Sequence, residues 1–519
     1  MPTLECLLSS LPEAQIICGS KDTHITELFC DSRKVLPGSL FICVLPDAYL
    51  YQRIHSGKEL TTIYISDSIK QGAIAIAAED EEILLSLPDH IVKILVPNAR
   101  RALALMAAEF YDHPSRKMVL VGLTGTNGKT TTANLTAQIL RHSGFKSVGV
   151  IGTLGATTEN TSFDTGHTTP GSLAVQRILS EFLKAGVEAV VMEASSHGLA
   201  LQRVVGCAFD IAIFTNFTQD HLDFHKTMEE YWAAKVLLFT EIAKYSTTFK
   251  PFTAIINIDD NYGRKLIDDV LNKASYKHKT YSIVENSVIK AENIKLATCG
   301  IEFSVGKYGE GETILFKVPL VGRFNVYNCL AAISVANHLK IPPVQLQEGL
   351  NSAKAPAGRM EVISEGQPFT VIVDFAHSPD ALREILTALG ELATGRIICL
   401  FGCGGRQNAD RSKPVNMGAV VAELADLIII TSDNPRFEDP QRIMEDIFAG
   451  VKIKGKESNT TMEIDRRKAI EYALGIAQEG DTVVFAGKGH ETYQWIREKK
   501  FPFDDREIAR EVLRSQQKA

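Results

Sequence analysis

The stretch that most constrains the fold is VLVGLTGTNGKTTT at residues 119–132, where an apolar run meets a glycine-rich turn. The apolar run predicts a buried strand, and the apolar spacing that follows predicts a helix ending near Gly144. Because glycines lack a side chain, Gly125 and Gly128 let backbone N–H groups approach an anion, and the helix N-terminus adds partial positive charge. Strand, glycine turn and helix together predict a phosphate-binding loop.

Lys129 and Thr130 follow the second glycine directly. In such loops the lysine neutralises a β- or γ-phosphate and the threonine hydroxyl binds Mg²⁺. The spacing differs from the common G-x-x-x-x-G-K-[ST], because only Thr126 and Asn127 separate the two nearest glycines; it is the compact form G-T-N-G-K-T. A plain turn between two elements would explain the glycines but not the Lys-Thr pair, so the motif favours nucleotide binding.

Composition narrows the class of protein. At 519 residues the chain is too long for one ordinary core and predicts about three domains. The net charge of −7 gives no basic surface for nucleic acid, and no apolar stretch reaches the roughly 18 residues that a membrane helix needs. Nine cysteines without a CxxC pair indicate free thiols in a reducing compartment, and the start MPTLECLLSS does not resemble a signal peptide. We therefore expect a cytoplasmic protein without nucleic-acid partners or membrane insertion.

Residues 1–114 predict a small α/β unit. Strand patterns lie on either side of a turn at Pro37-Gly38, and IVKILVPNARRALALMAAEFY predicts a strand that runs into a helix. The turn Asp31-Ser32-Arg33 has residue types that bind anions, but such turns more often only satisfy their own backbone. Both interpretations stay open.

Residues 115–355 alternate strand and helix patterns, which predicts a parallel sheet covered by helices. Ligands of such sheets bind at the carboxyl ends of the strands. Two expected strands end in polar groups, which are Glu193, Ser195, Ser196 and His197 after VVM, and Asn216, Asp220, His221 and Asp223 after IAIFT. A strand-end carboxylate such as Glu193 suits Mg²⁺, and a neutral His221 suits a second metal. Either residue alone is equally well explained as a polar strand end, but beside a phosphate loop we favour a metal site.

Residues 356–519 repeat the α/β rhythm and predict a second doubly wound sheet. Each expected strand again stops at a polar loop; these loops hold Asp374 and His377, then Gly404, Gly405 and Arg406, then Asp433 to Arg436, then Lys488 to Glu491. Four such loops on one edge predict a ligand crevice that faces the central part of the chain. The tail from Arg506 combines helix formers with several charges and predicts a solvated helix.

Taken together, these motifs resemble the Mur ligases, the ATP-dependent enzymes that build the peptide of bacterial cell-wall precursors. The matching pieces span nearly the whole chain in the family's order and are TGTNGKTT, MEASSHGLALQRV, FTNFTQDHLDFH, YWAAK, GRFNVYNCLAA, AGRMEV, DFAHSPDAL, FGCGG, DNPR and GKGHE. The pattern is most similar to the members that add meso-2,6-diaminopimelate to UDP-N-acetylmuramoyl-L-alanyl-D-glutamate in peptidoglycan synthesis.

The resemblance implies three domains and a monomer. A small N-terminal α/β domain at 1–114 would bind the UDP-substrate, and a central P-loop-type domain with a parallel sheet at 115–355 would bind ATP. A C-terminal Rossmann-like domain at 356–519 would bind the amino acid. The family reaction phosphorylates the substrate carboxylate, and the incoming amine then displaces phosphate from the acyl phosphate. Because the carboxylate and the phosphate are both anions, neutralisation of their charge would be the main contribution to catalysis.

The resemblance also assigns roles to residues. The catalytic set would be Lys129, Glu193, His221 and Lys235. The Mg²⁺ ligands would be Thr130, Glu193, His221 and Lys235. Lys235 matches a lysine that the family carbamylates with CO₂, which turns a cation into a metal-binding anion. ATP would contact Gly125, Thr126, Asn127, Gly128, Lys129, Thr130, Thr131, Asn325, Asn328, Arg359 and Asp374. The UDP-substrate would contact Ser32, Thr168, Thr169, Ser195 and Arg203.

The amino-acid pocket implied by the resemblance comprises Arg406, Asp433, Asn434, Pro435, Arg436, Gly487 and Glu491. The loop after FGCGG is one residue longer than the family pattern, so Arg411 competes with Arg406 for one role. Arg436 would select diaminopimelate, because a buried guanidinium matches its distal carboxylate with two parallel hydrogen bonds and lysine-adding relatives lack this arginine.

Other functions stay open on the sequence alone. The same ligation with L-lysine requires only a different pocket. A folylpolyglutamate synthetase shares the compact phosphate loop and the carbamylated lysine, but lacks the first domain and DNPR. A P-loop kinase or nucleotide switch needs only the phosphate loop and leaves the other motifs unexplained. A non-catalytic binding protein would have no need for Lys129, Glu193, His221 and Lys235 together.

Overall fold

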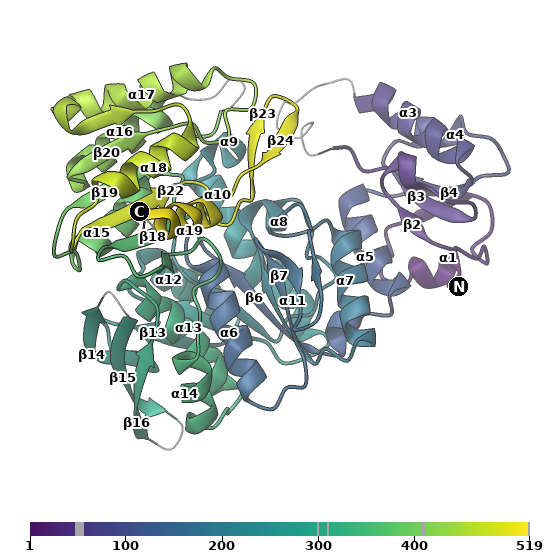
Figure 1. Ribbon diagram of the computed structural model, residues 1–519. Coiled ribbons are helices and arrows are strands. Elements are labelled where there is room, and N and C mark those ends of the chain that lie inside the picture. Colours follow the sequence, from purple (N-terminus) through teal and green to yellow (C-terminus); the bar gives the residue numbers. More distant parts are fainter. Residues whose placement is uncertain (47–56, 298–299, 309–310, 406–410, 517–519) are drawn as a thin grey trace.

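The computed structural model describes residues 1–46, 57–297, 300–308, 311–405 and 411–516. Three sheets of five, eleven and six strands follow one another along the chain, and we call the parts that contain them the N-terminal, central and third units (Figure 1). In that view the N-terminal unit lies at the right, the third unit at the upper left, and the central unit below and between them. The expected α/β class is confirmed, whereas the boundaries at 114/115 and 355/356 stay predictions.

The N-terminal sheet has the order β1-β5-β4-β3-β2, with β1 antiparallel to β5 and the other neighbours parallel. The strands expected around Pro37-Gly38 are present as β2 and β3, and the expected strand-to-helix pattern is present as β5 and α5. Its elements are α1 (Leu4–Leu7), β1 (Gln15–Cys18), β2 (Leu28–Phe29), η1 (Ser32–Lys34), β3 (Ser39–Ile42), α3 (Gly57–Lys70), β4 (Ala73–Ala78), α4 (Glu81–Leu85), β5 (Val92–Leu95) and α5 (Ala99–Phe110).

The central sheet has the order β16-β15-β14-β13-β12-β11-β6-β10-β7-β8-β9. Its middle, from β7 to β14, is parallel as expected, but both ends add antiparallel strands that the sequence patterns did not predict. The strands are β6 (Val119–Thr124), β7 (Val148–Gly152), β8 (Gly155–Thr157), β9 (Ser162–Phe163), β10 (Ala189–Glu193), β11 (Ile211–Phe214), β12 (Thr253–Asn257), β13 (Lys277–Ser282), β14 (Ile289–Ala297), β15 (Gly300–Tyr308) and β16 (Glu312–Val318).

Successive side chains of a strand point to opposite faces, and in β6 both faces are buried, which explains its continuous apolar run. Leu120 joins the core on one face, while Val121 and Leu123 join the core on the other, beneath α6, α13 and α14. The helices of this unit are η2 (Pro114–Arg116), α6 (Lys129–His142), α7 (Ser172–Lys184), α8 (Ser196–Ala200), α9 (Leu222–His225), α10 (Met228–Val236), η3 (Leu237–Phe239), α11 (Glu241–Thr247), α12 (Asn261–Leu266), η4 (Ile267–Leu271), α13 (Phe324–His338) and α14 (Pro343–Asn351).

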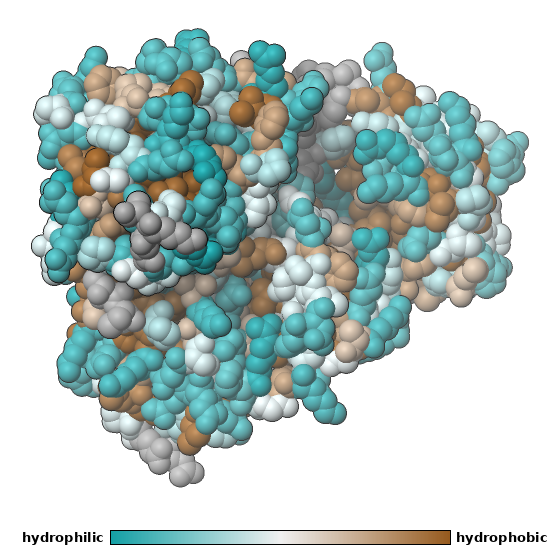
Figure 2. Space-filling model, viewed as in Figure 1, coloured by the Kyte–Doolittle hydropathy of each residue, from teal (hydrophilic) through white to brown (hydrophobic). Residues whose placement is uncertain are grey.

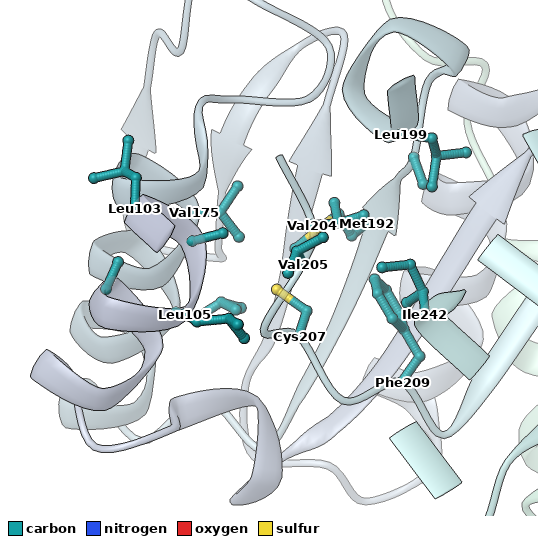
Figure 3. Packing of buried hydrophobic residues seen from close by; sticks show 14 of the residues in the cluster. Leu103, Leu105, Val175, Met192, Leu199, Val204, Val205, Cys207, Phe209 and Ile242 are labelled. Carbon is teal, nitrogen blue, oxygen red and sulfur yellow. The ribbon is translucent and has the colours of Figure 1, made fainter. Parts of the chain in front are cut away.

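The first of these cores is shared between two units. Leu103 and Leu105 of α5 lie in the same buried cluster as Val175 of α7 and Cys207, and Figure 3 shows where these side chains lie in that cluster. Helices α5 and α7 therefore pack together across the boundary between the N-terminal and central units. Apolar burial of this kind is the main stabilising contribution to a core, at about 25 cal/mol per Å².

The third sheet has the order β17-β18-β22-β19-β20-β21 and is parallel apart from β17, which confirms the expected doubly wound sheet. A separate hairpin, β23–β24, follows it. The elements are β17 (Glu361–Ile363), β18 (Thr370–Asp374), α15 (Pro379–Gly390), β19 (Ile397–Phe401), α16 (Ser412–Leu424), β20 (Leu427–Ile430), α17 (Pro440–Ile453), η5 (Glu457–Asn459), β21 (Thr460–Met462), α18 (Arg466–Ile476), β22 (Thr482–Ala486), β23 (Tyr493–Ile496), β24 (Lys499–Pro502) and α19 (Asp505–Gln516).

Helix α19 corrects the expectation of a solvated tail. Ile508, Val512 and Leu513 are buried against the third sheet, so only the opposite face of the helix is in water. Its start is fixed by an ion pair between Asp505 and Arg466 of α18, 2.6 Å apart and with both side chains fully buried. The Arg466 guanidinium also donates to two backbone carbonyl oxygens near strand ends, those of Ser432 at 3.4 Å and Ala486 at 3.2 Å.

Hydrophilic side chains predominate on the face shown in Figure 2, where the N-terminal unit stands apart from the third unit. Among the described residues, no helix combines the length and the apolar character needed to cross a membrane. This agrees with the absence of a long apolar run in the sequence.

Candidate active site

The phosphate-binding loop predicted between β6 and α6 is present. Gly128 caps the N-terminus of α6 with a φ of 83°, and Gly125 has a φ of 149°. A side chain at either position would also collide with a neighbour, because a Cβ on Gly125 would overlap the Thr215 hydroxyl and one on Gly128 the amide oxygen of Asn328. Both positions therefore require glycine for conformation and for space.

The side chain of Lys129 lies over this loop. Its Nζ donates to the carbonyl oxygens of Gly125 at 2.9 Å and Thr126 at 2.8 Å. Burial lowers the pKa of Lys129, while the nearby Glu193 carboxylate works against that shift. Neutral carbonyl oxygens thus hold the ammonium at the mouth of the loop. A phosphate oxygen that enters the loop is a stronger acceptor than these carbonyl oxygens, because it is charged.

Glu193, at the end of β10, is 1% exposed and lies beside the start of α6. Its Oε2 accepts from the hydroxyls of Thr130 at 3.1 Å and Thr153 at 3.2 Å, and its Oε1 accepts from the Thr153 N–H at 2.9 Å. Each of these donors is neutral, so the carboxylate is buried beside a phosphate loop with no cationic side chain of the described residues bonded to it. This oxygen-rich arrangement fits a hard cation such as Mg²⁺. Thr153 was missed in the sequence, although it directly follows a strand.

Lys235, on α10, lies beneath the same loop and is 2% exposed. Its Nζ donates to the Gly125 carbonyl oxygen at 2.7 Å and lies 4.4 Å from the centre of the Tyr231 ring. Burial, with a smaller contribution from Lys129, lowers the pKa of Lys235 well below its ordinary value. A neutral amine is the form that reacts with CO₂, so the environment suits the predicted carbamylation.

His221 follows β11 and takes a left-handed φ of 54°. Its side chain is 41% exposed at the cleft and its Nε2 lies 3.4 Å from Oδ2 of Asp220. Desolvation by the cleft walls lowers the pKa of His221, Lys129 and Lys235 lower it further, and Asp220 opposes them. The imidazole is therefore neutral near pH 7, as a metal ligand must be.

The four predicted metal ligands do not form one carboxylate cluster. In the part of the chain that the structure describes, no group of three or more His, Cys, Asp and Glu side chains is placed to hold a metal ion. Glu193 with Thr130 fits a first cation, whereas near His221 the anionic oxygens are those of Asp220, to which a carbamylated Lys235 would add another.

A cleft of about 1140 Å³ joins the phosphate loop to the third unit. Its volume is sufficient for a nucleotide. The predicted residues that line it are Thr126, Asn127, Gly128, Lys129, Thr130, Thr131, Thr168, Glu193, Ser195, His221, Asn325, Asn328, Arg359 and Asp374. The structure therefore brings most of the predicted ATP-binding residues together.

The far wall of the cleft combines amide, guanidinium and carboxylate groups. Asn328 Nδ2 donates to Asn325 Oδ1 at 2.8 Å, so the two side chains orient each other. The Arg359 guanidinium lies 4.7 Å from the centre of the Phe375 ring, and its buried Nε has no hydrogen-bond partner among the residues that the structure describes. Burial raises the pKa of Asp374, whose oxygens already accept two backbone N–H groups at 2.7 Å.

Glu384 of α15 also reaches into the cleft, and sequence patterns gave no reason to single it out. Its Oε2 accepts from the side-chain amide of Asn127 at 3.1 Å, a hydrogen bond that links the phosphate loop to the third unit. Burial, with a contribution from Asp374, raises the pKa of Glu384 to about 7.

The residues predicted for the UDP-substrate are only partly brought together. Thr169 Oγ1 donates to the Glu193 carbonyl oxygen at 2.7 Å and lies 3.0 Å from Ser195 Oγ, while Arg203 donates to the Thr169 carbonyl oxygen at 2.7 Å. Thr168 lies nearby and lines the cleft. Ser32 begins η1 in the N-terminal unit and is not among the described residues that line this cleft.

The two loops predicted to hold the amino acid are bonded to each other. Asn434 Nδ2 donates to Glu491 Oε2 at 2.7 Å. Lys488 belongs to the polar loop predicted at 488–491 but was not assigned to the pocket. It is fully buried and donates to Asn434 Oδ1 at 3.2 Å, Glu491 Oε2 at 3.3 Å and the Tyr493 carbonyl oxygen at 2.6 Å. Gly487 has a φ of 109°, and a Cβ there would lie 2.6 Å from Asp433 Oδ2.

Arg436 differs from the expectation of a buried cation. Pro435 before it is buried, but the Arg436 side chain is exposed and its φ is 55°. Its guanidinium carbon lies 4.9 Å from the centre of the Trp495 ring in the hairpin β23–β24. Of the two competing arginines, Arg406 lies outside the described residues, whereas Arg411 is paired with Asp446 and with Glu438.

Family models and known proteins match most of this chain. The Mur ligase middle-domain model matches residues 123–336, and the glutamate ligase domain model of the Mur ligases matches residues 358–489. UDP-N-acetylmuramoyl-L-alanyl-D-glutamate--2,6-diaminopimelate ligase of Caldanaerobacter subterraneus subsp. tengcongensis is 41% identical over 504 residues, 97% of each chain. The ligase of the same name from Geobacillus thermodenitrificans is 40% identical, covering 98% of this chain and 99% of its own. A solved structure of a ligase with that name matches with a TM-score of 0.69 at 30% identity, covering 99% of both chains.

Proposed function

The chain belongs to the Mur ligase family, and from this premise we propose that it joins meso-2,6-diaminopimelate to UDP-N-acetylmuramoyl-L-alanyl-D-glutamate in an ATP-dependent reaction. The observation that carries the proposal is one cleft in which a phosphate loop, a buried carboxylate and a buried lysine meet, in a chain about 40% identical over nearly its full length to ligases of that name. The reaction makes a precursor of peptidoglycan.

In the first step, an oxygen of the substrate carboxylate attacks the γ-phosphorus of ATP, and ADP leaves. In the second, the amine nitrogen of diaminopimelate attacks the acyl carbon, loses a proton and expels phosphate. Lys129 serves the first step, because its ammonium exchanges loop carbonyl oxygens for phosphate oxygens without leaving its place. Backbone N–H groups of the phosphate loop hold the remaining phosphate charge.

Mg²⁺, when bound, neutralises charge between the nucleotide and the substrate carboxylate. Thr130 and Glu193 would hold one ion, and His221 with a carbamylated Lys235 would hold a second. Carbamylation joins the neutral Lys235 amine to the carbon of CO₂ and releases one proton, which leaves an anion where a cation would repel the ion. The buried, pKa-depressed amine and the neutral imidazole support this assignment.

The nucleotide would lie along the far wall of the cleft. Asn325 and Asn328 offer amide groups near the phosphate loop, and Asp374 suits the ribose hydroxyls. The unpartnered Nε of Arg359 supplies a donor for a phosphate or ribose oxygen.

The other two substrates would reach the phosphate end of the cleft from different sides. Thr168, Thr169, Ser195 and Arg203 would hold the UDP-substrate, with Ser32 contributing from the N-terminal unit. The loops bearing Asp433, Asn434, Pro435, Arg436, Gly487 and Glu491 would hold diaminopimelate. We further propose domains at 1–114, 115–355 and 356–519, a monomer, and a cytoplasmic location, where these substrates are available.

Release of phosphate from ATP tests the proposal. The protein is mixed with the UDP-dipeptide and with meso-diaminopimelate, L-lysine or a folate plus glutamate. We expect release that depends on both co-substrates and is fastest with meso-diaminopimelate. Release that needs no amine indicates a kinase or nucleotide switch, equal use of L-lysine indicates the other tripeptide ligase, and activity on folate indicates a folylpolyglutamate synthetase.

A further inference from the structure

Arg436 combines an exposed side chain with a strained backbone. Its φ of 55° lies in the left-handed region, which residues with a side chain adopt rarely and at a cost in free energy. A long exposed side chain samples many rotamers in water and loses that freedom when it binds a ligand. A guanidinium that acts as a selector therefore needs a support that fixes it beforehand.

The hairpin β23–β24 supplies that support through its backbone. The Trp495 N–H donates to Asn434 Oδ1 at 2.9 Å, and the Trp495 carbonyl oxygen accepts from the Arg436 N–H at 2.9 Å. The next bond, from the Arg497 N–H to the Arg436 carbonyl oxygen at 2.6 Å, closes a short bridge beside Ile496. Hydrogen bonds on both sides of Pro435 thus fix the loop to the hairpin.

The indole ring of Trp495 then supports the side chain. It is half-buried, and the Arg436 guanidinium lies 4.9 Å from its centre, within the range of a cation–π contact. Trp is the strongest aromatic partner for a cation, and a planar guanidinium stacks on it better than an ammonium does. Lys500 of β24 lies 5.5 Å from the same ring and adds positive charge beside it.

We propose that Trp495 is a positioning residue that holds the Arg436 guanidinium ready for the distal carboxylate of diaminopimelate and so strengthens the preference for that acid over lysine. This inference rests on the proposed function, since it names the same amino-acid pocket. Trp495 itself need not touch the substrate.

Steady-state kinetics test the role. Trp495→Leu keeps the backbone bonds and removes the aromatic face, so we expect the KM for meso-diaminopimelate to rise about two- to fivefold, with kcat and the KM for ATP unchanged. Trp495→Phe should recover part of the loss. Ile496→Leu, a change at the next residue of the same strand, is the matched control and should leave all constants unchanged. In an Arg436→Ala background, Trp495→Leu should have no further effect, because the partner is gone.

Unchanged kinetics in Trp495→Leu, or an equal effect of Trp495→Leu with and without Arg436, would overturn the inference. The failure of this inference can be distinguished from failure of the proposed function. If the parent protein forms product with neither meso-diaminopimelate nor lysine, the proposed function is rejected, and the role of Trp495 with it. If the parent is active and the Trp495→Leu variant has the same kinetics, only the role of Trp495 is rejected.

A second measurement needs no substrate. The chain has two tryptophans, Trp232 and Trp495, so in a Trp232→Phe background the emission comes from Trp495. Quenching by acrylamide should increase in Arg436→Ala, which uncovers the ring, and should not change in Arg497→Ala, a neighbouring cation in the same hairpin. Equal quenching in the parent and Arg436→Ala would show that the guanidinium does not cover the indole and would overturn the inference.

Discussion

Asn127 of the phosphate loop donates a hydrogen bond to Glu384 of α15 across the cleft, at 3.1 Å. The loop that would hold phosphate is therefore attached to the third unit before any nucleotide arrives. The same contact places a half-buried acidic side chain, on which Asp374 acts electrostatically, at the joint between two units.

The first prediction concerns pH and Glu384. Its pKa is raised to about 7, so between the ordinary pKa near 4.5 and 7 the folded protein binds more protons than the unfolded chain. Stability therefore falls as pH rises through this window. Glu384→Gln keeps an acceptor for Asn127 without the charge, and its melting temperature should exceed that of the parent more at pH 8 than at pH 5. Glu348→Gln, at an exposed position of α14, is the control. A gap between Glu384→Gln and parent that does not grow with pH would contradict the prediction.

The second prediction concerns Lys235. Lys235→Ala removes the amine that would carry the carbamate, while Ala is well tolerated in a helix. We expect phosphate release to fall by orders of magnitude with a native circular dichroism spectrum, and short carboxylic acids to restore part of it. Lys244→Ala, an exposed lysine of α11, should be fully active. Near-normal activity of Lys235→Ala in CO₂-free buffer would reject the carbamate.

The third prediction concerns the metal requirement. Glu193→Gln preserves shape and loses charge, and His221→Ala removes an imidazole whose pKa is lowered mainly by desolvation in the cleft. Because hard cations depend on anionic oxygen, Glu193→Gln should need a higher Mg²⁺ concentration for half-maximal rate, and His221→Ala should do the same for a second ion. If both variants titrate with Mg²⁺ as the parent does, these two strand ends do not hold the metal.

The fourth prediction concerns Arg436. The hydrogen bond between the Arg436 guanidinium and the distal carboxylate of diaminopimelate would be charge-assisted but partly exposed. The loss of such a bond typically costs about 1.5–3 kcal/mol of binding free energy. Arg436→Ala should therefore raise the KM for meso-diaminopimelate about ten- to hundredfold and leave the constants for ATP and the UDP-dipeptide nearly unchanged. An unchanged diaminopimelate KM would remove Arg436 from the pocket.

The fifth prediction concerns the buried ion pair of Arg466 and Asp505. Asp505→Ala leaves a guanidinium uncompensated in the core and should reduce the free energy of unfolding by about 3–5 kcal/mol. Replacing both residues, as Arg466→Met with Asp505→Leu, should recover much of this loss in chemical denaturation. A single variant as stable as the parent would mean that the pair is not buried in solution.

Sequence patterns predicted the elements whose signal is local. The apolar run of β6 and the Gly-Lys-Thr turn identified the phosphate loop, and strand-end position identified Glu193 and His221. The antiparallel pairs at the two ends of the central sheet were missed, because the partner of a strand and its direction depend on residues distant in the sequence.

Contacts between distant parts of the chain gave no such signal. The sequence placed Lys488 in a polar loop after a strand, but only the folded structure shows that its side chain is buried and bonded to Asn434 and Glu491. Arg466 and Asp505 are 39 residues apart, so no periodicity links them. The exposure of Arg436 and its stacking on Trp495 depend on a hairpin that the sequence analysis did not predict.

The core shared by α5 and α7 limits how this protein can evolve by recombination. If the N-terminal unit were exchanged for that of a distant relative with a cut near residue 114, Leu103 and Leu105 of α5 would be separated from Val175 of α7, with which they share one buried cluster. A chimera would then expose or mispack an apolar face on each partner. Chimeras that fold should therefore take α5 and α7 from the same parent. The segment that can be exchanged as a whole then extends beyond the N-terminal sheet and its helices.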